Sequence, residues 1–357
     1  MAPSFRYQLQ AYASSRRNRY ACPRCEQAYQ FTRWLDTQTG EQLPAEFGCC
    51  NRVVQCGYAR SPYEKDPDGH SYATRQRAAN VSLPSRPARP RPKPTPPLCV
   101  IPEPLVQQSL GAYSRNGLAQ LLRARFGAGI AADLLQRFEI GTSTHWPGAT
   151  VFWQRDEWGR VRGGQVVLFD AQGHTVKHRR PDGTLQRCTT WVHTALAHRY
   201  RQHGLPQPAW LTQYLDPANQ VAKSPSLYGL SQLAMVPAGQ PVALVEAPKT
   251  AVVCTGYFPE VTWLAVGSLK QLTSERLRPL KAYPLMLYPD ASATGQAYAY
   301  WATKADQFRQ QGFILNVSRL LEETLTPTQQ AAGYDLADIL LEQWAGYPPS
   351  WDGPRLA

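Results

Sequence analysis

The pattern between residues 242 and 317 constrains the fold of this chain more than any other feature. Four short apolar runs there alternate with segments of helical periodicity. Strand and helix alternating at this spacing are typical of a parallel sheet with right-handed crossovers. We therefore expect an α/β domain over residues 236–346. Its predicted strands are 242–245, 262–266, 285–288 and 313–317, and its predicted helices are 249–257, 274–280, 296–311 and one near 335–344.

Two of these strands end on a carboxylate. Glu246 follows the first strand and Asp290 follows the third, and the carboxyl ends of parallel strands meet at one edge of a sheet. Two carboxylates at that edge could hold a divalent metal ion against phosphate oxygens. Alternatively, Glu246 is a helix N-terminal acid favoured by the helix dipole, and Asp290 is a helix cap. Lys249, one helical step beyond Glu246, could pair with that carboxylate or contact phosphate.

Five of the eight cysteines lie between positions 22 and 56, in a chain with no apolar export segment at its start. Cysteines clustered in this way indicate metal ligands rather than disulfides. Cys22 and Cys25 form a C-x2-C pair, which supplies two thiolates from one tight turn. The second pair is Cys56 with either Cys49 or Cys50, and we prefer Cys50. The prediction is a structural Zn²⁺ in a zinc ribbon over residues 1–80; the alternative is a redox pair or unliganded thiols.

Positive charge is concentrated in the N-terminal part of the chain. Residues 1–100 contain 15 Lys and Arg against 7 Asp and Glu, and the whole chain has a net charge of +12. A basic end indicates a polyanionic partner, with nucleic acid ahead of an acidic membrane; the alternative is a solvated basic surface. Arginine beside aromatic residues suits single-stranded DNA or RNA, so we expect Arg24, Arg33, Trp34 and Arg52 to contact it. The aromatic residues could equally form the core of the ribbon.

Between the cysteine pairs, residues 31–35 are typical of a strand and residues 36–40 of its hairpin turn. Nine prolines between Val81 and Pro104, interleaved with basic residues, predict an extended linker over residues 81–104. Residues 347–357 are a predicted tail.

Residues 105–235 are predicted to combine short helices with a β-rich stretch. Lys177, Arg179 and Arg180 belong to a basic segment between two strands, which could bind nucleic acid. Two or three short helices are predicted within the segments 105–110, 118–126 and 131–138, and strands are predicted at 149–154, 164–170 and around 191–193. The chain as a whole is thus expected to be an α+β multidomain protein.

No apolar run approaches the roughly 18 residues that a membrane span needs. We therefore expect a cytoplasmic protein without a membrane partner.

The C-terminal pattern resembles a Toprim domain, the metal-binding catalytic fold of bacterial primases, topoisomerases and some nucleases. Glu246 matches the family's glutamate after the first strand, and Asp290 matches the leading Asp of its Asp-x-Asp. The segment Asp335-Leu-Ala-Asp338 resembles the late acidic element of primase-type members. The resemblance implies that Glu246 acts as acid or base, and that Asp290, with Asp335 and Asp338, binds Mg²⁺ or Mn²⁺. The order of zinc ribbon, β-rich segment and Toprim domain is also that of bacterial and phage primases.

Four short motifs are similar to those of an uncharacterised zinc-ribbon and Toprim-like group in Bacteroidetes genomes and their mobile elements. They are Cys-Gly-Tyr-x-x-Ser-Pro, His-Trp-Pro-Gly-Ala, Val-Glu-x-x-Lys-Thr-Ala and Tyr-Pro-Asp, beginning at residues 56, 145, 245 and 288. One departure from the Toprim pattern is Ser292, which stands where the second Asp of Asp-x-Asp is expected. A hydroxyl is a far poorer Mg²⁺ ligand than a carboxylate. The site is therefore either a one-metal variant or a degenerate one.

Three functions follow from these features. The first is a primase-like enzyme that takes nucleoside triphosphates in the replication of a chromosome or mobile element. The second is a non-catalytic DNA- or RNA-binding accessory module, and the third is a metal-dependent nuclease. The sequence holds no G-x-x-x-x-G-K-[ST] motif, so any unwinding requires a separate helicase.

Overall fold

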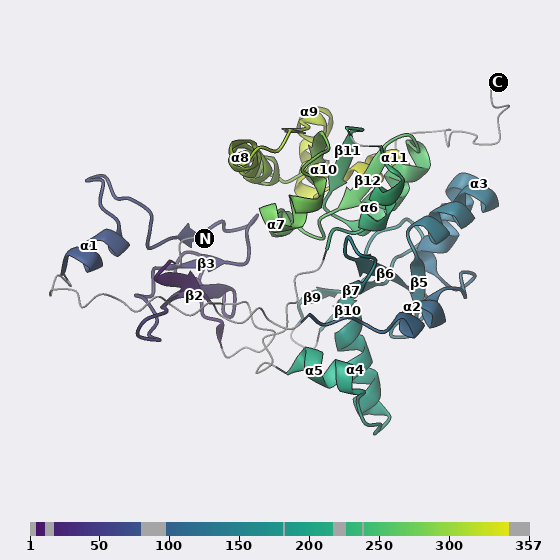
Figure 1. Ribbon diagram of the computed structural model, residues 1–357, viewed down its shortest axis with the longest axis horizontal. Coiled ribbons are helices and arrows are strands. Elements are labelled where there is room, and N and C mark those ends of the chain that lie inside the picture. Colours follow the sequence, from purple (N-terminus) through teal and green to yellow (C-terminus); the bar gives the residue numbers. More distant parts are fainter. Residues whose placement is uncertain are drawn as a thin grey trace. The chain divides into compact units, whose positions relative to one another are not determined.

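The computed structural model describes residues 5–10, 18–79, 98–180, 183–216, 226–237 and 239–342. The chain divides into two compact units, residues 1–94 and 95–357 (Figure 1). The predicted tail 347–357 and residues 81–97 of the predicted linker lie outside the described residues. Within the described ranges, no helix has both the length and the apolar character that crossing a membrane requires.

The first unit contains an antiparallel sheet in the order β1-β2-β3-β4, followed by the helix α1. The predicted strand at 31–35 is confirmed as β2. The predicted turn is confirmed as well: the Gly40 amide donates to the Asp36 carbonyl at 2.8 Å, and Gly40 has a φ of +77° that favours glycine. The elements are β1 Tyr7–Leu9, β2 Phe31–Asp36, β3 Gly48–Cys50, β4 Ala59–Arg60 and α1 Tyr72–Ala79.

The core of the first unit is small and aromatic. Tyr7, Leu43 and Phe47 are buried, and Trp34 and Tyr72 pack against them. The rings of Phe47 and Tyr72 lie 4.8 Å apart. Because so short a segment buries little apolar surface, a unit of this kind depends on a further source of stability such as a bound metal.

The second unit contains the predicted parallel sheet, in the order β12-β11-β13-β14. The prediction is confirmed to the residue for β11 and β13; β12 ends one residue earlier than expected and β14 begins two residues later. The strands are β11 Val242–Val245, β12 Thr262–Ala265, β13 Leu285–Tyr288 and β14 Leu315–Val317.

Helices cover both faces of this sheet, so its strands are apolar on both sides. In β11, Ala243 and Val245 pack into the cluster shared with α6 and α11, whereas Val242 and Leu244 pack into the cluster shared with α8. The helices of this region are α6 Pro248–Tyr257, α7 Ser274–Leu277, α8 Gln296–Gln310, α9 Leu320–Thr324, α10 Pro327–Ala332 and α11 Leu336–Glu342, with 3-10 turns at Leu269–Gln271 and Arg278–Leu280.

The middle of the chain contains an antiparallel sheet in the order β10-β7-β6-β5, and a separate hairpin of β8 and β9. Its strands are β5 Ile140–Ser143, β6 Ala149–Arg155, β7 Val161–Val167, β8 Lys177–Arg179, β9 Leu185–Arg187 and β10 Thr189–Trp191. Its helices are α2 Glu103–Ser109, α3 Gly117–Arg137, α4 Val192–Gln202 and α5 Ala209–Leu215, with a 3-10 turn at Leu230–Met235.

The helices expected at 118–126 and 131–138 are confirmed as two helical segments within α3, separated at Gly127, whose φ of +80° and ψ of 173° are not helical. One element differs from the prediction. The strand expected around residues 191–193 is β10, which ends at Trp191, and α4 begins at Val192. Val192 and Ala195 are buried against the sheet, so tertiary packing overrides the β preference of the local sequence.

The middle and C-terminal regions share one hydrophobic core. Phe126 of α3 lies against α6, where a Cβ on Gly256 would come within 2.6 Å of its ring. The Phe126 and Tyr257 rings meet edge to face at 5.1 Å. Residues of the region predicted as 105–235 and of the region predicted as 236–346 therefore form one compact body.

Candidate functional site

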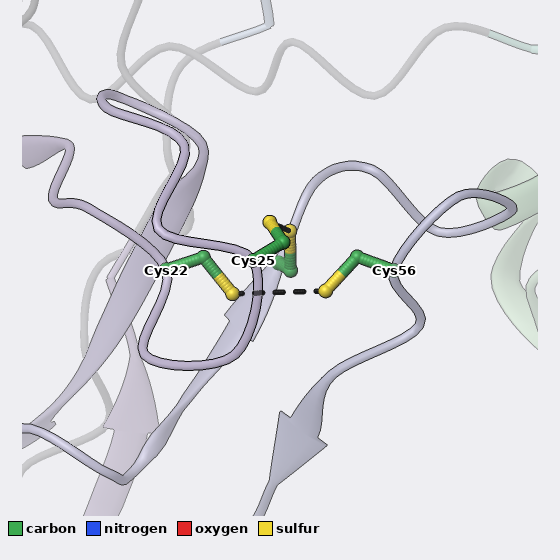
Figure 2. A group of neighbouring side chains, drawn as sticks. Cys22, Cys25 and Cys56 are labelled. Atoms are coloured by element: carbon green, nitrogen blue, oxygen red, sulfur yellow. Dashed lines mark hydrogen bonds between the residues drawn. The ribbon is translucent and has the colours of Figure 1, made fainter.

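Four cysteines of the first unit converge on one point (Figure 2). The sulfurs of Cys22, Cys25, Cys50 and Cys56 all lie within 4.8 Å of one another. The Sγ atoms of Cys22 and Cys56 are 3.7 Å apart, and those of Cys25 and Cys50 are 4.0 Å apart. A tetrahedral site with Zn–S bonds of about 2.3 Å separates its sulfurs by about 3.8 Å. The donor set and its spacing fit a structural Zn²⁺.

Two tight turns and one strand end hold these sulfurs. The Glu26 amide donates to the Cys22 carbonyl at 2.9 Å, closing the C-x2-C turn. The amides of Cys56 and Gly57 both donate to the Arg52 carbonyl, at 2.8 and 3.1 Å. Gly57 has a φ of +64°, which explains the glycine directly after the last ligand.

The structure distinguishes the two adjacent cysteines of β3. Side chains alternate along a strand, and Cys50 is the one that lies with Cys22, Cys25 and Cys56. The Cys49 thiol instead donates to the Cys50 carbonyl at 3.7 Å. Burial raises the pKa of the Cys50 thiol to about 12, so the apo thiol stays protonated. Zinc coordination requires the thiolate and would displace that proton.

The predicted acidic residues of the second unit meet at a separate cavity of about 810 Å³. β11 and β13 are adjacent parallel strands, so Glu246 and Asp290 leave the sheet at the same edge. The Asp290 amide donates to Glu246 Oε1 at 3.3 Å. Glu246 is 9% exposed. Both side chains line the cavity, as Lys249, Asp335 and Asp338 do.

Lys249 pairs with the late acidic residues and not with Glu246. Its Nζ lies 2.7 Å from Asp338 Oδ1 and 3.5 Å from Asp335 Oδ2. Thr250 Oγ1 also donates to Asp335 Oδ2, at 2.7 Å. The Asp338 amide donates to Asp335 Oδ1 at 2.9 Å, and the Asp335 amide donates to Asp338 Oδ2 at 3.1 Å. These two carboxylates are thus already partly neutralised within the protein.

Glu246 and Asp290 lie in a different electrostatic environment. Burial and the nearby charge of Asp335 raise the pKa of Glu246 to about 7, although the Asp290 amide opposes the shift. Burial, followed by the charges of Glu246 and Asp335, raises the pKa of Asp290 well above its usual range. The charge of Lys249 offsets only part of the shift at Asp290, and a bound cation would favour the ionised form of both acids.

The acidic side chains are less organised for metal than the cysteines are. The four cysteines bring their donor atoms within 4.8 Å of one another. Among the described residues, no set of three or more carboxylates meets this criterion. Ser292 is buried, and its Oγ accepts a hydrogen bond from the Ala297 amide in the first turn of α8, at 3.0 Å. That hydroxyl supports the helix instead of facing an ion.

The lining of the same cavity also includes basic residues of the β8–β9 hairpin. Lys177 of β8 and Arg187 of β9 are paired in register and both line the cavity. Arg179 donates to the Gly183 carbonyl at 3.0 Å, and Arg180 donates to Gln186 at 2.6 Å. Arg187 was not among the residues singled out from the sequence. The signal that could have identified it is its place in the second strand of the hairpin, where its register partner is Lys177.

The other predicted nucleic-acid contacts lie in the first unit and also support its fold. Arg24 donates to the Cys56 carbonyl at 3.2 Å. Arg33 donates to the Leu43 carbonyl and stacks on Tyr20 at 5.4 Å. Trp34 packs edge to face against Tyr63 at 6.1 Å. Arg52 contributes the carbonyl that closes the second cysteine turn.

Two family models match parts of the chain. A zinc beta-ribbon finger matches residues 5–70, and this match together with the four-cysteine cluster supports a structural Zn²⁺. A domain of unknown function (DUF6371) matches residues 116–291, just under half of the chain. No curated protein matches the sequence at a significant level.

Solved primase structures are among those similar to the chain. The primase fragment of the bacteriophage T7 primase-helicase is 12% identical with a TM-score of 0.36, and the match covers 90% of this chain and 93% of that one. The E. coli primase catalytic core is 14% identical with a TM-score of 0.39, covering 64% of this chain and 73% of that one. A DnaG primase catalytic domain bound to ssDNA is 15% identical with a TM-score of 0.35, covering 62% and 74%. TM-scores below 0.5 do not establish a common fold.

Proposed function

We propose that this protein is a primase-like, nucleic-acid-binding enzyme with a Toprim-like phosphoryl-transfer site at the acidic cavity. One observation carries the proposal: the lining of a single cavity includes both the acids Glu246 and Asp290 and the basic residues Lys177 and Arg187. A phosphate substrate with a divalent cation needs both kinds of charge at close range, because the basic groups bind phosphate and the acids hold the ion.

In this proposal the residues of the cavity have three roles, which are metal binding, proton transfer and phosphate binding. Asp290, with Glu246 beside it, would hold a Mg²⁺ or Mn²⁺ ion, which when bound would polarise a phosphate oxygen and offset developing negative charge. Glu246, with a pKa of about 7, can accept or donate a proton near neutral pH. Lys177 and Arg187 bind the phosphates of a nucleoside triphosphate or a nucleic-acid strand.

Asp335 and Asp338 have a positioning role in this proposal. They hold Lys249 in a buried ion pair, and the Ala291 amide donates to the Tyr334 carbonyl at 2.8 Å, which joins the segments carrying Asp290 and Asp335. The zinc ribbon, with Arg24, Arg33, Trp34 and Arg52, is proposed to contribute single-strand contacts. We also propose that the protein acts in the replication of a chromosome or mobile element, and that a separate helicase unwinds the duplex.

A second candidate is a nucleic-acid-binding module without catalysis. Ser292 supports it, because the hydroxyl that replaces an acid is committed to α8. The pairing of Lys249 with Asp335 and Asp338 supports it as well, because it removes two carboxylates from metal binding.

Oligonucleotide synthesis separates the candidates. Wild type, Glu246→Ala and the exposed control Glu260→Ala are incubated with single-stranded template, nucleoside triphosphates and Mg²⁺ or Mn²⁺. Primer product that disappears in Glu246→Ala but persists in Glu260→Ala supports the primase. Cleavage of the template with the same dependence indicates the nuclease. Salt-sensitive binding without either reaction indicates the module and contradicts the enzymatic proposal.

A further inference from the structure

The antiparallel sheet of the second unit has cavities on both of its faces. Along β6 and β7, Phe152 and Val167 line the acidic cavity, whereas Val151, Trp153 and Val166 line a second cavity. Side chains alternate between the two faces of a sheet, so the second cavity lies on the side away from Glu246. It is therefore separate from the proposed phosphoryl-transfer site.

The second cavity has a volume of about 510 Å³ and lies between α2, α4 and the sheet. This volume is within the range of small-molecule sites. Two glycines set the close packing beneath it. A Cβ on Gly141 would come within 2.3 Å of Ser109 Oγ, and one on Gly164 within 2.8 Å of Val192. The Trp153 indole nitrogen donates to Ser109 Oγ at 2.8 Å, which fixes the ring in the floor.

The mouth of this cavity is polar and basic. Arg199 and His198 of α4 are exposed and line it, together with His203 just beyond the helix. His145 also lines the cavity, and its ring lies 5.6 Å from that of His198. Of the described residues that line the cavity, none is an aspartate or glutamate.

The floor has the opposite character. It is formed by aliphatic side chains and the buried face of Trp153, and they offer no charge. The residues are Leu105, Val151, Val166, Val192, Ala195 and Leu196. An apolar floor beneath a rim of convergent polar groups is the usual construction of a ligand site.

We propose that this cavity binds a small organic anion, with an apolar body on the Trp153 floor and a phosphate or carboxylate at Arg199 and His145. A guanidinium presents parallel N–H groups that match either anion. The lack of acidic lining residues disfavours cationic ligands. The inference does not depend on the proposed phosphoryl transfer, because the two cavities lie on opposite faces of the sheet.

Isothermal titration calorimetry of the zinc-loaded full chain tests this proposal. The probes are naphthyl phosphate and octanoate, which represent aromatic phosphates and aliphatic carboxylates, with naphthol and inorganic phosphate as their single-feature counterparts. We expect at least one of the first two to bind, and naphthol and inorganic phosphate to bind more weakly. Arg199→Gln should weaken the binding by about tenfold or more, because it removes a charged hydrogen bond.

The matched control is Arg201→Gln, on the same helix. Arg201 donates to the Ala197 carbonyl at 3.3 Å and is not a lining residue, so its loss should change affinity less than Arg199→Gln does. Absence of binding by both naphthyl phosphate and octanoate would overturn the proposal. So would binding that is weakened by Lys177→Gln but not by Arg199→Gln, since that anion would occupy the acidic cavity.

Discussion

The cysteine cluster and the acidic cavity show two ways in which a chain can gather metal-binding side chains. The cluster has four donors of one kind at spacings that match one ion. The cavity instead mixes acids with cations, and Lys249 already neutralises part of the negative charge. A complete donor set favours tight, permanent binding that stabilises a fold. An incomplete donor set leaves negative charge that a substrate and an exchangeable metal ion could neutralise.

Of the changes that test this comparison, the loss of zinc should have the largest effect on stability. Structural zinc contributes about 10–16 kcal/mol in small zinc domains, far more than an aromatic core of this size can replace. Cys50→Ser should therefore abolish stoichiometric zinc and unfold the first unit. Zinc content by mass spectrometry, together with loss of the dispersed amide signals of residues 18–79 in NMR spectra, measures this outcome.

The adjacent cysteine provides the matched control. Cys49→Ser should retain one zinc per chain, because the Cys49 thiol contacts the Cys50 carbonyl and lies outside the cluster. Equal zinc content in the two variants would show that the third ligand can be exchanged between the two positions. The contrast between a complete and an incomplete donor set would then be lost.

The next largest effect is expected at Lys249. Replacing it with methionine leaves Asp335 and Asp338 buried without their cation, which typically costs about 3–5 kcal/mol. Chemical denaturation should show this loss for Lys249→Met, whereas Lys281→Met, at an exposed lysine, should stay close to wild type. A stable Lys249→Met protein would mean that Asp335 and Asp338 do not need the lysine, and that they are available to bind metal.

Local sequence pattern was sufficient for much of the parallel sheet. β11 and β13 are continuous apolar runs ended by Glu246 and by Pro289-Asp290, and the predicted limits are confirmed. Elements fixed by tertiary packing were not predictable in this way. α4 begins at Val192, a residue that favours strands, because its apolar side buries against the antiparallel sheet. The division of α3 into two helical segments at Gly127, in contrast, agrees with the helices predicted at 118–126 and 131–138.

The same limit applies to the sites. The preference for Cys50 over Cys49 is confirmed, but strand alternation could exclude Cys49 only once the register of β3 against β2 was known. Lys249 pairs with Asp338 because α11 packs against α6. The two residues are 89 positions apart in the sequence, so no local pattern predicts the pair. The convergence of Glu246 and Asp290 was predictable because it follows from two adjacent parallel strands.

Glu246→Gln should have a smaller effect, and one of opposite sign. Ionising a buried acid whose pKa is about 7 destabilises the folded state at neutral pH, so the neutral amide should stabilise it by about 1–3 kcal/mol. Millimolar Mg²⁺ should stabilise the wild type by mass action and leave this variant unchanged. Denaturation at neutral pH with and without Mg²⁺ measures both effects, with Glu260→Gln as the exposed control. A Glu246→Gln variant that is less stable, or that responds to Mg²⁺ as wild type does, would contradict the proposed cation site.

The smallest effect is expected at Glu103, a carboxylate whose pKa moves in the opposite direction from that of Glu246. Both of its oxygens accept hydrogen bonds from Arg155, at 2.7 and 2.8 Å, and this lowers its pKa from 4.5 to about 2. Because the folded-state value is the lower one, the pair stabilises the fold above about pH 4.5 and loses that contribution as the pH falls toward 2.

Glu103→Gln should therefore lower the melting temperature at neutral pH and bring it closer to that of wild type at the acidic end. The effect should be small, because the Glu103 side chain is 48% exposed and water screens the pair. Melting curves over this pH range test it, with Glu323→Gln in an exposed helical pair as the control. A constant difference between Glu103→Gln and wild type at all pH values would mean that packing, rather than charge, accounts for the contribution of Glu103. In that case Glu103 would no longer serve as the arginine-paired counterpart of the cavity acids, and only the Glu246 variant would test the effect of charge.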